Sequence, residues 1–363
     1  MRPVLLILAA VLLAAAGACA PVRQGPVGLD TPQHHRKIGR KFLELEKYAD
    51  ALREFTRAKD LQENSLSWMG IALAEAGLGR MDQAMEHLDQ AMRYAWIDGH
   101  VVEVYTARIR ALTMGGDAWS ANWLEQAKYA FDRARGMDPD DDAPFFYMGL
   151  AYKQGLKFVE AGRLFAAVIQ KNGDYAARAD KEYAEVQKIR RAKPRSEVGK
   201  RIALADRITR AQAAALLVAE TDAEALLGGT ERDPRLPTDI TGHPLAPEIM
   251  AAVRLGIDGL SLYPDGSFGP DEPVTRCQFA TAVQDFLIRA SSRPVLATEF
   301  SGVSSPFPDV KKDSPCFNAV MVCTTRGLLQ ARDLSTGCFA PADAVSGIDA
   351  LCAASALRSL LTR

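Results

Sequence analysis

Two arginines occupy the same unusual place in the C-terminal half of the chain. Thr209 and Arg210 open one apolar run, and Thr275 and Arg276 open another, each with a glutamine three residues after the threonine. The Thr-x-x-Gln spacing is that of a capping box, in which the two side chains satisfy backbone groups at the start of a helix. The box predicts helices that begin at Arg210 and Arg276, but it does not explain why each begins with a cation.

A cation at the first helical position opposes the helix dipole, at a cost of about 0.3–1 kcal/mol. A helix N-terminus combined with a guanidinium is suited to a carboxylate or a phosphate. The repeated arrangement therefore predicts an anion site bordered by Arg210 and Arg276. The alternative is an exposed arginine paired with a nearby carboxylate, such as Asp206 or Asp271.

A loop rich in glycine, proline and aspartate precedes the second of these helices. It runs from Gly259 to Pro273 and contains the turn dipeptide Asp265–Gly266. Residues 247–255 before the loop and the run after Thr275 carry apolar side chains at helical spacing. This unit is therefore predicted to be helix, loop and helix.

Two other stretches repeat parts of this unit. A shift of 66 residues places Thr209 under Thr275, and a shift of 71 residues aligns the unit with the end of the chain. The matching pairs at the second shift are Gly256 with Gly327, Phe268 with Phe339, Pro270 with Pro341 and, one residue off, Asp239 with Asp309. We therefore expect three related units, at about 195–225, 236–292 and 303–363.

The motifs of these units resemble the S-layer homology (SLH) family. Residues 263–270 are similar to its Gly-Tyr-x-Asp-Gly-x-Phe-x-Pro loop, and residues 208–212 and 274–278 to its Ile-Thr-Arg-Ala-Glu helix start. The resemblance implies three units around a pseudo-threefold axis, with grooves that bind anionic, often pyruvylated, cell-wall glycopolymers. It implies glycan or anion-binding roles for Arg210, Arg276, Thr209, Thr275, Asp265 and Gly266.

The third unit departs from the family pattern. Gly347 stands where the arginine is expected, although Ser346 keeps the cap, and the loop at 331–339 lacks the Tyr and the Asp-Gly. We predict that this unit keeps its packing role and has lost its own ligand site. The first unit lacks a recognisable opening and loop.

The N-terminus has the features of a lipoprotein leader. Residues 1–18 combine an early arginine with a short apolar run, which is typical of a signal peptide. Ala16-Gly17-Ala18-Cys19 resembles a bacterial lipobox, with Ala16 where leucine is usual. We expect Cys19 to be lipidated, followed by a linker at 19–31. The alternative is ordinary cleavage after Ala18 or Ala20.

An exported chain can form disulfides, and five cysteines lie in its last quarter: Cys277, Cys316, Cys323, Cys338 and Cys352. An odd number leaves at least one thiol free or paired between chains. Cys323 and Cys352 correspond to Ala252 and Thr281 on the two predicted helices of the preceding unit. We expect these two cysteines to pair. The spacings do not resemble a zinc site.

Residues 32–192 carry a different repeat, with a period of about 34 residues. The second helix of each unit has the pattern small, large, small, and a glycine or alanine stands twelve residues earlier. The four copies begin at Ala51, Ala84, Ala127 and Ala161. The pattern resembles tetratricopeptide (TPR) repeats, in which the small residues let helices approach and the large one fills the groove between units. Such units stack because one alone cannot bury its apolar face.

Together these features predict a mostly α protein, with a TPR α-solenoid followed by a triple SLH helical pseudo-trimer module at 195–363. We expect a non-catalytic cell-envelope lipoprotein on the periplasmic face of the outer membrane. Its expected partners are a cell-wall polysaccharide or peptidoglycan-linked polymer, an unknown protein on the TPR surface, and the membrane.

The alternative is an outer-membrane lipoprotein scaffold for a secretion, pilus or envelope assembly complex, with a vestigial SLH module. A net charge of -1 gives no support for nucleic acid. No nucleophile elbow, paired histidine or metal motif indicates an enzyme, a cofactor or a bound metal.

Overall fold

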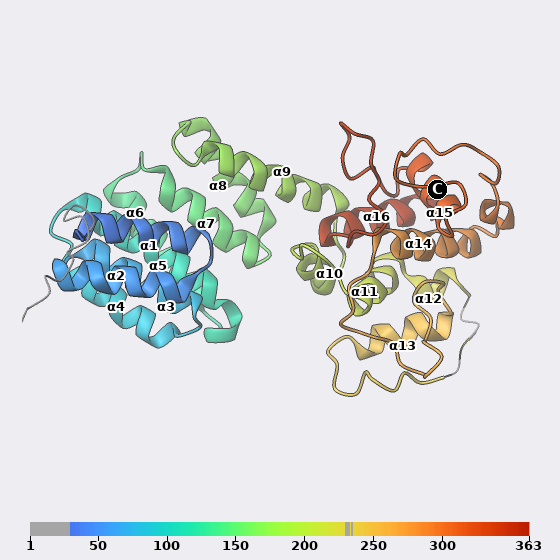
Figure 1. Cartoon of the computed structure of the whole chain (residues 1–363), viewed down its shortest axis with the longest axis horizontal. Coiled ribbons are helices and arrows are strands. Elements are labelled where there is room, and N and C mark those ends of the chain that lie inside the picture. Colours follow the sequence, from blue (N-terminus) through green and yellow to red (C-terminus); the bar gives the residue numbers. More distant parts are fainter. Residues whose placement is uncertain (1–29, 229–232, 234, 363) are drawn as a thin grey trace, which may run out of the picture.

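The computed structural model describes residues 30–228, 233 and 235–362. The predicted leader, Cys19 and the linker up to residue 29 lie outside these residues. The described part of the chain folds into α-helices and one short 3-10 helix, without a β-strand (Figure 1). The predicted mostly α class is therefore confirmed.

The first nine helices form a stack in which each helix packs on its neighbours along the chain (Figure 1). They are α1 (Pro32–Glu44), α2 (Tyr48–Leu61), α3 (Ser65–Gly77), α4 (Met81–Arg93), α5 (Asp98–Trp119), α6 (Trp123–Met137), α7 (Asp142–Gln154), α8 (Phe158–Lys171) and α9 (Ala176–Ala192). The odd-numbered helices also contact one another in order, so they form one layer of the stack.

The small and large residues of the repeat pattern pack as the spacing predicts. The Phe55 ring on α2 lies between α1 and α3, where a Cβ added to Gly39 or Gly70 would come within 2.8 Å or 2.1 Å of it. Phe165 on α8 fills the corresponding space against Gly149 on α7. Both phenylalanines are fully buried. Glycine is required at these three positions because the rings occupy the place of a side chain.

The third pair of helices is irregular. Helix α5 has 22 residues, and Gly116 near its end has a left-handed φ of 50° that breaks the helical path. Trp119 follows the break and donates from Nε1 to the Asp82 carboxylate at 3.1 Å. The turn at Gly116 therefore redirects the chain while its tryptophan ties α5 to α4.

The C-terminal half consists of helices joined by longer loops than those of the stack. They are α10 (Glu197–Ile202), α11 (Arg210–Thr221), α12 (Ala223–Leu226), α13 (Ala246–Leu255), α14 (Arg276–Ala290), η1 (Pro294–Ala297), α15 (Phe317–Thr325) and α16 (Gly347–Leu361). Helices α11, α14 and α16 are the second helices of the three predicted units. Helix α13 packs on α11, and α15 packs on α14, so each of these first helices covers the second helix of the preceding unit.

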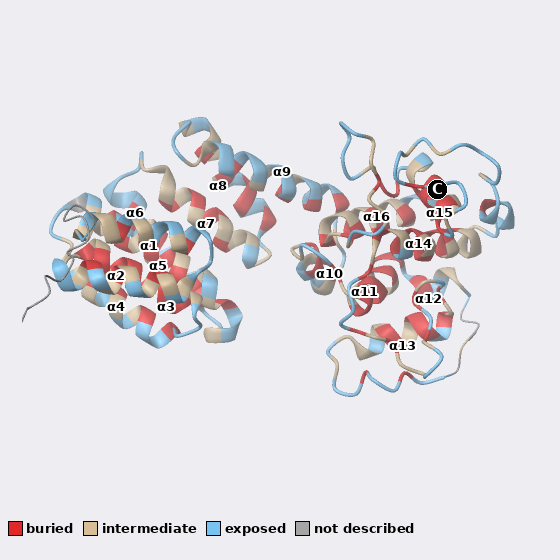
Figure 2. Cartoon of the chain, viewed as in Figure 1, coloured by how far each residue is buried: buried red, intermediate tan, exposed pale blue. Residues whose placement is uncertain are grey.

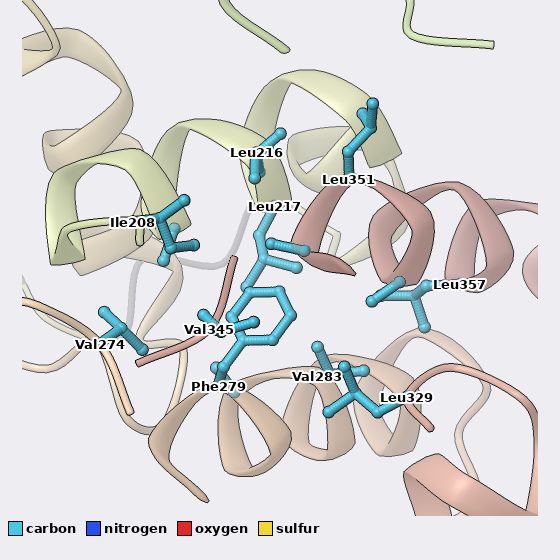
Figure 3. Packing of buried hydrophobic residues seen from close by; sticks show 14 of the residues in the cluster. Ile208, Leu216, Leu217, Val274, Phe279, Val283, Leu329, Val345, Leu351 and Leu357 are labelled. Atoms are coloured by element: carbon cyan, nitrogen blue, oxygen red, sulfur yellow. The ribbon is translucent and has the colours of Figure 1, made fainter. Parts of the chain in front are cut away.

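Three backbone hydrogen bonds form a closed ring at the centre of this half. The N–H of Ile208 donates to the carbonyl of Val345, that of Val345 to Val274, and that of Val274 back to Ile208, each at 3.0 Å. The three residues lie two positions before the starts of α11, α16 and α14, and their side chains meet those of Leu217 and Phe279 in the shared core (Figure 3). These bonds define the pseudo-threefold axis of the C-terminal ring, as we call residues 197–362 below.

The end of the helical stack and the C-terminal ring share one apolar core. A continuous set of buried residues runs from Phe146 in α7 to Leu357 in α16. Helix α9 ends the stack and also packs on α16, as Figure 1 shows. In Figure 2 the buried positions lie on the helix faces turned toward other helices, and exposed positions cover the outside.

Candidate functional site

Arg210, the first residue of α11, is buried rather than exposed. It retains 4% exposure, and its guanidinium donates to three backbone carbonyls of the second unit's loop. These are the carbonyls of Phe268 at 2.7 Å, Gly259 at 2.9 Å and Ser261 at 2.8 Å. The guanidinium also lies 4.8 Å from the Phe268 ring and 4.9 Å from the Tyr263 ring. Arg210 therefore holds the second unit's loop against the first unit.

Arg276 has the same role at the next junction, where it holds the third unit's loop. It is 2% exposed, lies 4.5 Å from the Phe339 ring, and donates from Nε to the Phe339 carbonyl at 2.7 Å and from Nη2 to the Gln330 carbonyl. Its Nη1 lies 3.7 Å from a carboxylate oxygen of Asp349. Burial lowers the pKa of Arg276. The proposed pairing of exposed arginines with Asp206 or Asp271 is therefore wrong, because both guanidinium groups are enclosed by the next unit's loop.

The opening aspartates and the capping threonines fix the same loops. Asp239 accepts from the N–H groups of Phe268 and Gly269, both at 2.8 Å. Asp309 does the same for the third unit's loop, at 2.9 Å and 2.6 Å. Thr209 and Thr275 form the two predicted capping boxes. The loop is thus held from both sides, by a carboxylate on its N–H groups and by an arginine on its carbonyls.

Asp265 and Gly266 form the predicted turn at the tip of the second unit's loop. The Asp265 carboxylate accepts from the backbone N–H of Ser267 at 2.9 Å and from its hydroxyl at 2.7 Å. These bonds lower the pKa of Asp265, with the hydroxyl bond as the main cause. Gly266 has a φ of 85°, which favours glycine. In the structure both residues shape the turn.

The third junction of the ring closes without an arginine. Gly347 begins α16, and its N–H donates to the Ala205 carbonyl at 2.8 Å. A Cβ at Gly347 would lie 1.7 Å from the Ile202 carbonyl oxygen. The first unit has no long loop for an arginine to hold, so its backbone packs directly on α16. Gly347 is therefore the residue that this contact requires.

A cavity lies beside this third junction and has a volume of about 990 Å³. Its walls come from α9, from residues 203–206, from the third unit's loop at 327–334 and from the start of α16. The charged residues that carry its chemistry are Lys188, Arg191, Arg332, Arg276, Asp206 and Asp349. We call this hollow the junction cavity.

The available charge in the junction cavity is mainly positive. Glu185 also lines it but bonds to Lys153 at 2.7 Å, and Asp349 is the carboxylate beside Arg276. Among the described residues, no carboxylate lies within ion-pair distance of Lys188, Arg191 or Arg332. These three cations face Asp206 as the remaining acid, so the cavity is suited to an anionic ligand.

The junction cavity includes only one of the predicted glycan-binding residues. Arg276 lines it, whereas Arg210, Thr209, Thr275, Asp265 and Gly266 are not among its lining residues. Lys188 and Arg191 were not identified from the sequence, because the strongly charged helix that carries them is typical of a cap or a connector. Arg332 was not identified because it lies where the third loop departs from the motif.

The structure corrects the predicted disulfide. Cys277 at the start of α14 is bonded to Cys316 at the start of α15, while Cys323 and Cys352 are free thiols. Cys323 on α15 contacts α14, where its Sγ lies 3.5 Å from the Ala280 carbonyl. Cys352 lies on α16 and lines the junction cavity. The predicted pairing fails because α15 packs on the preceding unit's helix.

Comparison with known proteins supports the C-terminal resemblance. Residues 238–280 match the family model of the S-layer homology domain. The match covers the second unit from its opening aspartate into α14. No curated protein and no solved structure matches the chain. Residues 238–280 are therefore similar to an S-layer homology domain.

Among the residues that the structure describes, no helix is both long enough and apolar enough to cross a membrane. No group of three or more His, Cys, Asp or Glu side chains among them is placed to hold a metal ion.

Proposed function

We propose that the chain is a non-catalytic cell-envelope protein whose C-terminal ring binds an anionic cell-wall polysaccharide or peptidoglycan-linked polymer. The junction cavity carries the proposal, because it combines a volume of about 990 Å³ with three cations that lack carboxylate partners. The S-layer homology match at 238–280 supports the same class of ligand. In this proposal Lys188, Arg191 and Arg332 contact the polymer.

The two motif arginines have a supporting role in this proposal. Arg210 and Arg276 use two or three donors each on backbone carbonyls. They hold the loops in place, and Arg276 borders the cavity through its remaining edge. An alanine at either position would disturb the fold as well as any site.

In this proposal the N-terminal half of the chain is an arm tethered to a membrane. Cys19 would carry the lipid at the periplasmic face of the outer membrane, and the TPR-like stack would bind a partner protein. Helix stacks of this kind present an extended surface, which supports a docking role. Replacing Cys19 with alanine should release the chain from detergent-extractable membranes into the aqueous fraction, and retention of the variant would contradict the anchor.

Wall binding tests the central claim. The variant Lys188→Gln/Arg191→Gln/Arg332→Gln should lose about tenfold or more of its affinity for purified wall sacculi in a sedimentation assay. The matched control, Arg293→Gln/Lys311→Gln/Lys312→Gln, removes three exposed cations from the C-terminal ring and should bind as the parent does. Equal binding of both variants would refute the cavity as the site.

The second candidate function is a scaffold for a secretion, pilus or envelope assembly complex with a vestigial ring. The internal use of Arg210 and Arg276 favours it, because these guanidinium groups contribute little to a ligand. Complete absence of sacculus binding by the parent chain would select this candidate.

A further inference from the structure

A band of arginine and tyrosine side chains crosses three successive odd-numbered helices of the stack. Arg110 on α5 lies 4.6 Å from the Tyr147 ring on α7. The Tyr147 ring lies 5.5 Å from that of Tyr175, the residue before α9. Arg178 on α9 lies 5.3 Å from Tyr175 and 4.6 Å from the buried Phe146 ring beneath. We call Arg110, Tyr147, Tyr175 and Arg178 the arginine–tyrosine band.

The band has cations at both ends and lacks acidic partners. Among the described residues, neither Arg110 nor Arg178 has a carboxylate within ion-pair distance. Two acids near the band have other partners: Asp142 accepts the backbone N–H of Tyr175 at 3.1 Å, and Glu182 bonds to Lys153 at 2.6 Å. Arginines elsewhere on the stack do form ion pairs, as Arg53 does with Asp50 and Arg57 with Asp30.

Stacking leaves the binding edge of each arginine unused. A guanidinium on an aromatic ring interacts through its face, and its N–H donors lie around the edge. Those donors match the two oxygens of a carboxylate. Tyr147, Tyr175 and Arg110 are half-buried and Arg178 is exposed, so a ligand can reach the band.

The spacing of the two arginines indicates the size of the ligand. The contacts along the band limit the distance between the two guanidinium carbons to about 15 Å at most. A separation on that scale corresponds to about four residues of extended peptide. The charge and the length together fit a short polypeptide with acidic residues at both ends.

We propose that the arginine–tyrosine band binds an extended acidic segment of a partner protein, with carboxylates on Arg110 and Arg178 and the peptide chain across Tyr147 and Tyr175. The proposal rests on the partner-binding role proposed for the helical stack, and it names the chemistry of that partner. It is independent of the junction cavity, which lies between the ring and the C-terminal part of α9, at residues 185–192.

A labelled peptide tests the band directly. The probe is a fluorescein-labelled Glu-Glu-Ala-Ser-Ala-Ser-Glu-Glu peptide, and its counterpart carries glutamine in place of each glutamate. Fluorescence anisotropy with the purified full chain should show binding of the acidic peptide only. Arg110→Gln/Arg178→Gln should weaken it by about tenfold or more. The control Arg53→Gln/Arg57→Gln removes the same charge from two exposed, ion-paired arginines and should leave it unchanged.

Three results would overturn the proposal. They are no binding of the acidic peptide, equal loss in both double variants, or binding of an eight-nucleotide oligothymidylate through both band arginines without peptide binding. Circular dichroism of the Arg110→Gln/Arg178→Gln chain excludes unfolding. Sacculus binding by this variant should equal that of the parent, so failure of the band and failure of the wall-binding function give different results.

Discussion

At the scale of single residues, the ring shows that one type of position can be filled in two opposite ways. The first residue of the second helix is a buried arginine at two junctions and a glycine at the third. The arginines bridge to a loop that stands away from the helix, whereas Gly347 touches the backbone of the first unit. The choice follows the space at each junction, because a long loop needs a long donor and a short connection leaves no room for a side chain.

Gly347→Ala should therefore destabilise the chain. The added methyl would overlap the Ile202 carbonyl oxygen, 1.7 Å from the ideal Cβ, and the backbone must shift to admit it. Such overpacking costs about 1–3 kcal/mol, which a urea unfolding curve would show as a lower midpoint. Gly136 is the control, because a Cβ there meets nothing within 4 Å in α6. Gly136→Ala should stabilise the helix by about 0.5–1 kcal/mol. Equal midpoints for parent and Gly347→Ala would refute the contact.

The site residues were only partly predictable from the sequence. The motif identified Arg210 and Arg276 as special, and the capping boxes formed where the sequence placed them. Both arginines donate to backbone carbonyls of another unit. Every residue has a backbone carbonyl, so the sequence does not indicate which carbonyls accept these bonds. The sequence alone does not explain why Gly347 replaces the arginine, because a required contact and a missing side chain look alike in one sequence.

At the scale of elements, the pairing of helices decides the disulfide. Aligning the repeats placed Cys323 and Cys352 on the two helices of one unit, and those helices were expected to face each other. In the fold, each first helix instead covers the preceding unit's second helix. Cys316 at the start of α15 therefore meets Cys277 at the start of α14. The periodic helices of the stack were easier to predict, because their small and large residues pack against close neighbours in sequence.

The Cys277–Cys316 bond should stabilise the oxidised chain substantially. It joins residues 39 apart, and loop-closure entropy for that length corresponds to about 4 kcal/mol. Cys277→Ser/Cys316→Ser should lower the free energy of unfolding by about that amount, and a reductant should have the same effect on the parent only. Cys338→Ser, which replaces a half-exposed free thiol, serves as the control.

Mass mapping of non-reduced peptides checks the connectivity. A peptide pair joining Cys323 to Cys352 would contradict the structure.

Burial raises the pKa of Cys323 to about 12, so this thiol stays neutral and unreactive at neutral pH. Thiol labelling of the folded chain should accordingly reach Cys338 and spare Cys323.

At the scale of the whole molecule, the stack and the ring are joined by a buried charged group. Glu220 on α11 is fully buried and accepts from the N–H of Arg195 at 2.9 Å and from the N–H and hydroxyl of Ser196 at 3.0 and 2.7 Å. Arg358 on α16 lies 3.4 Å from the same carboxylate and 3.4 Å from the Lys193 carbonyl just after α9. One carboxylate thus ties the chain that leaves α9 to two helices of the ring.

This joint predicts that the two halves unfold together. The apolar cluster of the ring extends into helices α7 to α9 at the end of the stack, so calorimetry of the parent should show a single transition. Glu220→Ala would leave Arg358 without its partner and three donors unsatisfied, at a cost of about 3–5 kcal/mol, and should separate the ring from the stack into two transitions. Asp222→Asn is the control, because it weakens only the exposed Asp222–Arg195 pair, worth about 0–1 kcal/mol, and asparagine tolerates the left-handed φ of 57° at this position. Two well-separated transitions in the parent would show that the joint does not couple the halves.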